Sequence, residues 1–255
     1  MTAVQGTTVD IPTPDGVADA YLTCPDDGAA HPVVLFYMDA FGIRPHLIVM
    51  ADRLAASGYT VLVPNVFYRH GRAPVVELPE FIDPGRRPEI FDEIGPMMQA
   101  LTPELAMRDA GAYLDWVRQR PEADGAAVGV TGYCMGAVLA LRTAGTYPDQ
   151  VAAMAGFHGG GLATEEPDSP HRLAGSITAE LYFGHADQDH ALPPEQIERL
   201  DRALTEAGLS FRSEVYPGAG HGYTQADTAA YDEQATERHW SALLDLFDRT
   251  LKPDS

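Results

Sequence analysis

The stretch Gly132-Tyr133-Cys134-Met135-Gly136 decides how this sequence is interpreted. An apolar run over residues 126–131 precedes it, and a helix-like run over residues 137–145 follows it. A strand, a G-x-C-x-G turn and a helix make a nucleophile elbow, with cysteine where serine is more usual. Glycine suits both flanks because a side chain there would collide with neighbouring backbone. The sequence therefore predicts that Cys134 projects into a cleft at a helix N-terminus, where the helix dipole favours a thiolate.

Strand-like runs alternate with helix-like runs on both sides of this elbow. We predict strands over residues 7–12, 17–23, 32–38, 59–63, 126–131, 151–157, 177–183 and 211–216. We predict helices over residues 46–56, 102–118, 137–145, 193–207 and 232–251. Such alternation is typical of a mostly parallel sheet with helices on both faces. The elbow within this pattern predicts the α/β-hydrolase fold, in a single domain over residues 1–255.

The segment 68–101 departs from the alternation. It is rich in proline, glycine and charge, and it shows no clean hydrophobic period. A long irregular stretch in a compact domain is often a functional lid or pocket wall. The alternative interpretation is a surface excursion without a role.

Composition restricts the class of partner. The 255 residues carry a formal net charge of −20, and Lys252 is the only lysine. An acidic protein repels phosphate, which argues against nucleic acid or an anionic membrane as the partner. No apolar run reaches the roughly 18 residues of a membrane span, and residues 1–10 do not resemble a signal peptide. Cys24 and Cys134 are too few for a disulfide framework, so we expect reduced thiols and a cytoplasmic location.

The acid of a catalytic triad is expected after the strand 177–183. In this fold the order along the chain is nucleophile, acid, base. Asp187 and Asp189 compete for the position. Acids here often precede an x-x-apolar-Pro turn, and only Asp189, followed by residues 190–193, has that spacing. We predict Asp189 as the acid and Asp187 as a carboxylate that stabilises the turn or caps the helix.

The base is expected after the last strand, and His221 lies in the glycine-rich stretch 217–223. The remaining histidines are weaker candidates. We predict surface turns or helices for His31, His46, His70, His171 and His239, whereas His185 and His190 flank the acid and border the cleft. With His221 as base, Cys134 would attack an acyl carbonyl, and water would then release the acid from a thioester.

The oxyanion of this reaction needs two backbone N–H donors. We predict Met135, directly after the nucleophile, and Ala40, in the loop that follows the strand 32–38. The sequence His158-Gly159-Gly160-Gly161 resembles an esterase oxyanion motif, but that motif belongs before the nucleophile. We expect this stretch to border the pocket instead, with His158 contacting substrate, or to form only a tight turn.

Four motifs occur in the order found in the dienelactone hydrolase family, which this chain resembles from about residue 16 to residue 251. They are Gly132–Gly136, Asp39-Ala40-Phe41-Gly42, the stretch 189–193, and Gly220-His221. The resemblance implies a triad of Cys134, Asp189 and His221, with no metal and no organic cofactor. Phe41 and Tyr133, which lie within these motifs, are expected at the substrate pocket.

The resemblance also implies a role for Asp39. Founding members of the family carry a glutamate there, which contacts the resting thiol and takes part in its activation. Asp39 is shorter by one methylene group and could act with altered reach. The alternative is a carboxylate that caps its own loop.

The substrate end departs from the family pattern. Dienelactone-cleaving members bind the substrate carboxylate with arginines, one of them four residues after the catalytic histidine, where this chain has Gln225. A second family arginine falls in the stretch that contains Arg86 and Arg87. Glutamine cannot replace bidentate binding by arginine, so we expect a different or less charged ester or lactone. Arg44, Arg69 and Arg142 are alternative cationic contacts but are expected on the surface.

Two other functions use the same residues. A thioesterase or acyltransferase would employ the same triad, and a non-catalytic binding protein would keep Cys134 inert. A metal protein is disfavoured because His185, Asp187, Asp189 and His190 match neither a zinc spacing nor an EF-hand. The exposed positions do not predict an oligomeric interface. The leading hypothesis is a cysteine-dependent hydrolase of a small ester or lactone.

Overall fold

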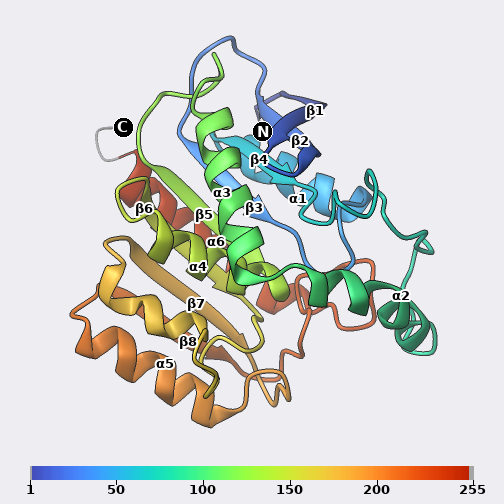
Figure 1. Ribbon diagram of the computed structural model, residues 1–255, viewed down its shortest axis with the longest axis vertical. Helices are drawn as coiled ribbons and strands as arrows, with labels where there is room; N and C mark the ends of the chain where they lie inside the picture. Colours follow the sequence, from blue (N-terminus) through green and yellow to red (C-terminus); the bar gives the residue numbers. More distant parts are fainter. Residues whose placement is uncertain (1, 253–255) are drawn as a thin grey trace.

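Eight strands form one sheet within residues 2–252, the part of the chain that the computed structural model describes (Figure 1). The strand order is β1-β2-β4-β3-β5-β6-β7-β8. The strands are β1 (Val4–Thr13), β2 (Gly16–Pro25), β3 (Val33–Tyr37), β4 (Thr60–Pro64), β5 (Val128–Tyr133), β6 (Val151–Phe157), β7 (Glu180–Ala186) and β8 (Phe211–Tyr216).

Strands β3 to β8 run parallel, and the hairpin β1–β2 joins them antiparallel through β4. Every residue of β3, β4 and β5 is buried. Strands buried on both faces have continuous apolar runs rather than alternating ones, as their sequences show. The predicted α/β-hydrolase architecture is confirmed.

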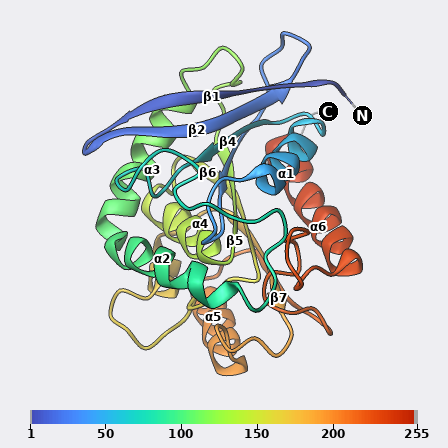
Figure 2. The same ribbon diagram turned by 90° about the vertical axis from the view of Figure 1, so that its right-hand side faces the viewer.

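Helices cover both faces of the sheet. They are α1 (Pro45–Ala55), α2 (Arg87–Ala100), α3 (Pro103–Val117), α4 (Met135–Thr146), α5 (Pro194–Glu206) and α6 (Glu233–Leu251), with a 3-10 helix at Pro170–Ser176. Figure 2 shows α3 and α4 on one side of the sheet and α1 and α6 on the other. Thr102 caps α3 by accepting a hydrogen bond from the Leu105 N–H. None of the helices within residues 2–252 has both the length and the apolarity needed to cross a bilayer.

The strand order places two loops at one edge of the sheet. Strand β3 lies between β4 and β5, so the chain reverses its direction of winding there. Ligands of open α/β sheets bind at the carboxyl ends of the strands, at such a switch point. Tyr37, which ends β3, is paired with Gly132 of β5. The loop after β3 and the cysteine elbow after β5 therefore lie side by side.

The segment 68–101 contains a helix that the sequence did not predict. Residues 68–86 are irregular, but α2 follows and buries Ile90 and Ile94. Gly95 and Pro96 interrupt its pattern, and both residue types weaken a helix on propensity alone. Burial of its apolar side chains compensates, as tertiary packing commonly does.

Candidate active site

Cys134 occupies the strained turn between β5 and α4. Its φ of 54° and ψ of −118° lie in a region that non-glycine residues rarely adopt. Its N–H donates to the Phe157 carbonyl oxygen over 3.1 Å, which fixes the turn. A Cβ at Gly132 would lie 2.0 Å from the Gly136 carbonyl oxygen, and a Cβ at Gly136 would lie 2.6 Å from the Tyr37 and Met38 carbonyl oxygens. Both flanking positions thus require glycine.

Three side chains from three loops meet at this turn. His221 Nε2 lies 3.1 Å from Cys134 Sγ, and His221 Nδ1 lies 2.6 Å from Asp189 Oδ2. Asp189 Oδ1 accepts a hydrogen bond from the Ala191 N–H at 2.8 Å, which orients the carboxylate. The Asp189 side chain is only 4% exposed. A thiol, an imidazole and a carboxylate are therefore within hydrogen-bonding reach of one another, the arrangement that a nucleophile, a base and an orienting acid require.

Asp187 is directed elsewhere. Its Oδ2 accepts a hydrogen bond from the Gly218 N–H at 2.9 Å, and its own N–H donates to the Ala219 carbonyl oxygen at 2.7 Å. These contacts tie the loop after β7 to the loop after β8. Asp187 therefore has the geometry of a turn-stabilising carboxylate, and Asp189 has the contact with His221.

The electrostatics favour a protonated imidazole. Burial alone lowers the pKa of His221, but hydrogen bonds and charge from Asp189 and Cys134 outweigh burial and raise it to about 10. Burial opposes ionisation of Asp189, yet the hydrogen bond and charge of His221 lower the pKa of its carboxyl group overall. The arrangement thus stabilises an imidazolium between two acceptors of its protons.

A pocket of about 550 Å³ opens over Cys134 and His221. Its size falls within the range of small-molecule sites. Its wall combines the triad with apolar side chains of α2 and with the loops after β6 and β7. The lining residues are Arg87, Phe91, Met98, Cys134, Met135, Gly160, Gly161, Asp187, Gln188, Asp189, His190, Ala191, Gly220 and His221.

Arg87 is the arginine that borders this pocket. It lies over the rings of Phe41 and Phe91, 5.9 Å and 5.6 Å from the ring centroids. Arg86 lies outside the pocket lining and pairs with Glu89 at 3.1 Å, with most of its side chain in solvent. Of the two arginines singled out in the sequence, only Arg87 can reach a bound molecule.

The two predicted oxyanion donors lie near the elbow. Met135 is the first residue of α4, so its N–H precedes the first intrahelical hydrogen bond. The contacts of Gly136 with the Tyr37 and Met38 carbonyls pack the start of α4 against the end of β3. Ala40, two residues after Met38, is held in the adjacent loop. Both peptide groups belong to segments that border Cys134.

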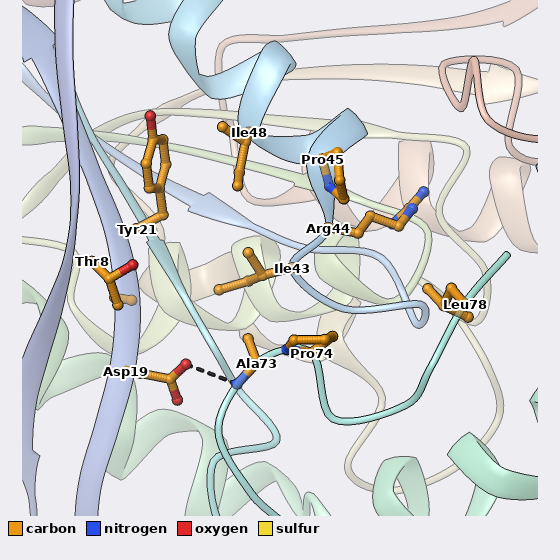
Figure 3. Close-up of a pocket in the computed structure, with 11 residues that line it drawn as sticks. Thr8, Asp19, Tyr21, Ile43, Arg44, Pro45, Ile48, Ala73, Pro74 and Leu78 are labelled. Carbon is orange, nitrogen blue, oxygen red and sulfur yellow. Dashed lines mark hydrogen bonds between the residues drawn. The ribbon is translucent and has the colours of Figure 1, made fainter. Parts of the chain in front are cut away.

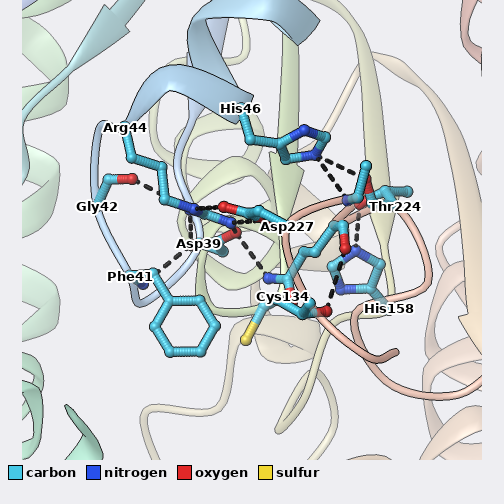
Figure 4. A network of polar contacts seen from close by, with 12 residues as sticks. Asp39, Phe41, Gly42, Arg44, His46, Cys134, His158, Thr224 and Asp227 are labelled. Carbon is cyan, nitrogen blue, oxygen red and sulfur yellow. Dashed lines mark hydrogen bonds and ion pairs between the residues drawn. The ribbon is translucent and has the colours of Figure 1, made fainter. Parts of the chain in front are cut away.

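Asp39 lies in a buried polar network rather than at the pocket surface (Figure 4). Its carboxylate accepts hydrogen bonds from both terminal nitrogens of Arg44, at 2.8 Å and 3.0 Å. Gln225 Nε2 donates to it at 2.7 Å. The expectation that Arg44 is a surface residue was wrong, because two carboxylates draw its guanidinium into the protein, where it is 5% exposed.

Three further positions differ from the expected pocket lining. His158 is fully buried, and its Nε2 bonds Thr224 Oγ1 at 2.8 Å. Tyr133 is 1% exposed, and its hydroxyl group bonds His239 Nε2 at 2.8 Å. Gln225 is 3% exposed. None of these three side chains belongs to the lining of the pocket over Cys134, because all three are buried in the protein.

The predicted surface position of His239 and His171 was also wrong. His239 has no exposed surface, and His171 is buried with Nδ1 2.8 Å from Ser169 Oγ. Burial lowers the pKa of His239 to about 3. The helical period of 233–251 places His239 on the apolar face with Trp240 and Leu243, a signal present in the sequence.

Within residues 2–252, no group of three or more His, Cys, Asp or Glu side chains is arranged to hold a metal ion.

The fold defines the chain as an α/β-hydrolase, with Cys134 in the turn between β5 and α4. The model of the dienelactone hydrolase family matches residues 18–251. The chain belongs to this family and is a carboxylic ester hydrolase.

Relatives of known sequence and structure agree with this assignment. A Synechocystis sp. protein is 28% identical over 98% of this chain and 98% of its own length. The carboxymethylenebutenolidase of Rhodococcus opacus is 27% identical over 91% of this chain and 86% of its own. A Klebsiella pneumoniae crystal structure shares the fold, with a TM-score of 0.84, 22% identity, and coverage of 97% of this chain and 100% of that one.

Proposed function

We propose that the protein hydrolyses a small ester or lactone through a thioester on Cys134. The observation that carries the proposal is the chain of contacts from Cys134 Sγ through His221 to Asp189, at 3.1 Å and 2.6 Å. These distances match the reach of a nucleophile, a general base and its orienting acid. The reaction class is inferred from membership of the family, and the residues that carry out the reaction are inferred from these contacts.

The reaction proceeds in two halves. The proton shared between Cys134 and His221 lies on His221 Nε2 when the sulfur attacks the acyl carbonyl carbon. The tetrahedral oxyanion is bound by the N–H groups of Met135 and Ala40. As the intermediate collapses, the leaving alkoxide takes the proton from His221. In a lactone, this alkoxide stays tethered to the acyl group.

Water completes the cycle. His221 takes a proton from water, and the resulting hydroxide attacks the thioester carbonyl. The sulfur then leaves as thiolate, the carboxylic acid is released, and His221 and Cys134 return to their starting state. Asp189 keeps the imidazole in the required tautomer and stabilises its cation in both halves.

The pocket favours an acyl group with apolar surface and at most one negative charge. Phe91, Met98 and Met135 supply apolar contacts, and Arg87 supplies a cation that can bind carboxylate. Gln225 is buried and bonded to Asp39, so it offers nothing to the substrate. The Rhodococcus opacus relative is a carboxymethylenebutenolidase. We propose a related substrate that this protein holds with fewer charged contacts.

We also propose that the protein acts in the cytoplasm. Both cysteines are free thiols, Cys24 being buried and Cys134 partly exposed, as a reducing compartment would maintain them.

The test compares wild-type protein with Cys134→Ala on four substrates: a neutral activated ester, a carboxylate-bearing ester, a lactone and a thioester. We expect the wild-type protein to turn over at least one of these substrates, and kcat to fall by at least about 10³-fold in Cys134→Ala. Cys24→Ala is the matched control and should retain full activity. Cys134→Ala with wild-type turnover would contradict the mechanism, and preference for the thioester would favour a thioesterase.

A further inference from the structure

Arg44 joins the two loops that carry the proposed oxyanion donor and the catalytic histidine. We call residues 39–42 the oxyanion loop and residues 217–228 the histidine loop. Arg44 Nη1 and Nη2 bond Asp39 of the oxyanion loop at 2.8 Å and 3.0 Å. Its Nε and Nη2 bond Asp227 of the histidine loop at 2.5 Å and 3.2 Å. Figure 4 shows the guanidinium between the two carboxylates.

The donors of Arg44 are fully used. A guanidinium has five N–H donors. Four of them bond Asp39 and Asp227, and Nη1 also donates to the Gly42 carbonyl oxygen at 3.2 Å. Arg44 therefore has no donor left for a substrate carboxylate. Its stem borders a second cavity of about 400 Å³, but the guanidinium points away from that cavity (Figure 3).

The acceptors of Asp39 are used as well. A carboxylate offers about four acceptor sites. Oδ1 accepts from the Phe41 N–H at 2.9 Å and from Arg44, and Oδ2 accepts from Arg44 and from Gln225. Gln225 belongs to the histidine loop, so it forms a second tie between the two loops. No acceptor site of Asp39 remains for the Cys134 thiol.

The network is buried and holds two carboxylates against one cation. Arg44 and Asp39 are 5% and 1% exposed, and the Asp227 side chain is 16% exposed. Charges in such surroundings are retained only when paired with good geometry. Removing the cation would leave two carboxylates facing each other, and one loop would have to move away from the other.

We propose that Arg44 is a positioning residue that sets the oxyanion loop relative to His221, and that Asp39 serves this tie rather than the Cys134 thiol. The proposal rests on the proposed function in that Ala40 is taken as an oxyanion donor. Ala40 follows Asp39 directly, and Asp227 and Gln225 lie six and four residues after His221. A displacement of the tie would thus misplace the donor relative to the base.

The test uses Arg44→Met and Arg44→Lys, with Arg53→Met as the matched control. Arg53 lies on α1 and makes its own bidentate pair with Glu237, at 2.7 Å for both bonds, on the exposed surface. Asp227→Asn weakens only the contact of Arg44 with the histidine loop, leaves the Gln225 contact with Asp39 in place, and serves if Arg44→Met does not fold. Melting temperature and circular dichroism establish that each variant is folded.

Three readouts separate positioning from a general structural role. We expect Arg44→Met to raise amide hydrogen exchange in residues 39–44 and 222–228 by at least about tenfold, with other segments unchanged. We expect kcat for a neutral activated ester to fall by roughly 10- to 100-fold, the effect of misplacing a catalytic group by about 1 Å. We expect Cys134 alkylation by iodoacetamide to keep its pH dependence in Arg44→Met and Asp39→Asn.

Several outcomes would overturn the proposal. A folded Arg44→Met protein with wild-type kcat and wild-type hydrogen exchange would show that Arg44 does not hold the two loops together. Full recovery by Arg44→Lys would show that charge alone suffices. A shifted pH profile of Cys134 alkylation in Asp39→Asn would show that Asp39 acts on the Cys134 thiol. If the wild-type protein cleaves none of the esters, the proposed function fails, and the exchange measurement still decides whether Arg44 ties the loops.

Discussion

Replacing Asp189 by asparagine perturbs the site with little change in shape. Asp189 Oδ2 accepts the His221 Nδ1 proton at 2.6 Å, and Oδ1 keeps the Ala191 N–H at 2.8 Å. In Asp189→Asn one of these acceptors becomes an N–H donor. If that nitrogen faces Nδ1, the imidazole must carry its proton on Nε2. His221 could then no longer accept the proton of Cys134.

The size of the effect follows from two contributions. The pKa of His221 rises from 6.5 to about 10, and Asp189 shares this effect with Cys134. Assigning half of the rise to Asp189 gives about 2.4 kcal/mol, or roughly a 60-fold loss of imidazolium stabilisation. The wrong tautomer alone reduces kcat by about 10⁴-fold in serine triads. We expect kcat to fall between these limits, by roughly 10²- to 10⁴-fold.

The assay compares Asp189→Asn with Asp187→Asn on a neutral activated ester. Asp187 lies two residues away and holds Gly218, so its replacement should change kcat by less than about fivefold. Both variants should show wild-type circular dichroism. The reasoning would be refuted if Asp187→Asn lost more activity than Asp189→Asn, or if Asp189→Asn kept wild-type kcat.

Three further predictions concern the elbow, the pocket and the charge state. Gly132→Ala should destabilise the protein by about 3 kcal/mol or more, because its Cβ meets backbone at 2.0 Å, whereas Gly95→Ala meets open space and should leave the melting temperature within a few degrees. Arg87→Met should raise KM for a carboxylate-bearing ester by about 10- to 100-fold and leave a neutral ester unaffected, with Arg86→Met as control. Because the folded-state pKa of His221 is raised to about 10, its stabilisation is complete below about pH 6.5 and is lost as the pH rises through about 10. The difference in melting temperature between wild-type and His221→Gln should therefore shrink between pH 7 and pH 10, and a difference that grows would contradict this protonation state.

The fold could be predicted because its signals are local. The run 126–131, the two glycines around Cys134 and the following apolar helix specify the elbow without reference to distant residues. Parallel strands buried on both faces appear as continuous apolar runs, which the sequence displays directly. Helix α2 could not be predicted in this way, since Gly95 and Pro96 lower its propensity and only packing of Ile90 and Ile94 sustains it.

The meeting of the three candidate residues was predictable, because their order along the chain carries that information. Cys134, Asp189 and His221 each follow a strand in the expected sequence, and the structure brings them into contact. The environment of Arg44 was not predictable, because an arginine at a helix start is usually exposed. Its burial depends on Asp227, which is 183 positions away and meets it only in the folded chain. Spacing in the sequence could not reveal that pairing.

A thioester on Cys134 is the central claim, and trapping it is the most direct test. Wild-type protein is mixed with an activated ester, quenched in acid within one turnover, digested, and analysed by mass spectrometry. We predict the acyl mass on the peptide containing Cys134, none on the peptide containing Cys24, and no adduct in Cys134→Ala. Acyl mass on another residue, or full turnover in Cys134→Ala with no adduct, would contradict the account.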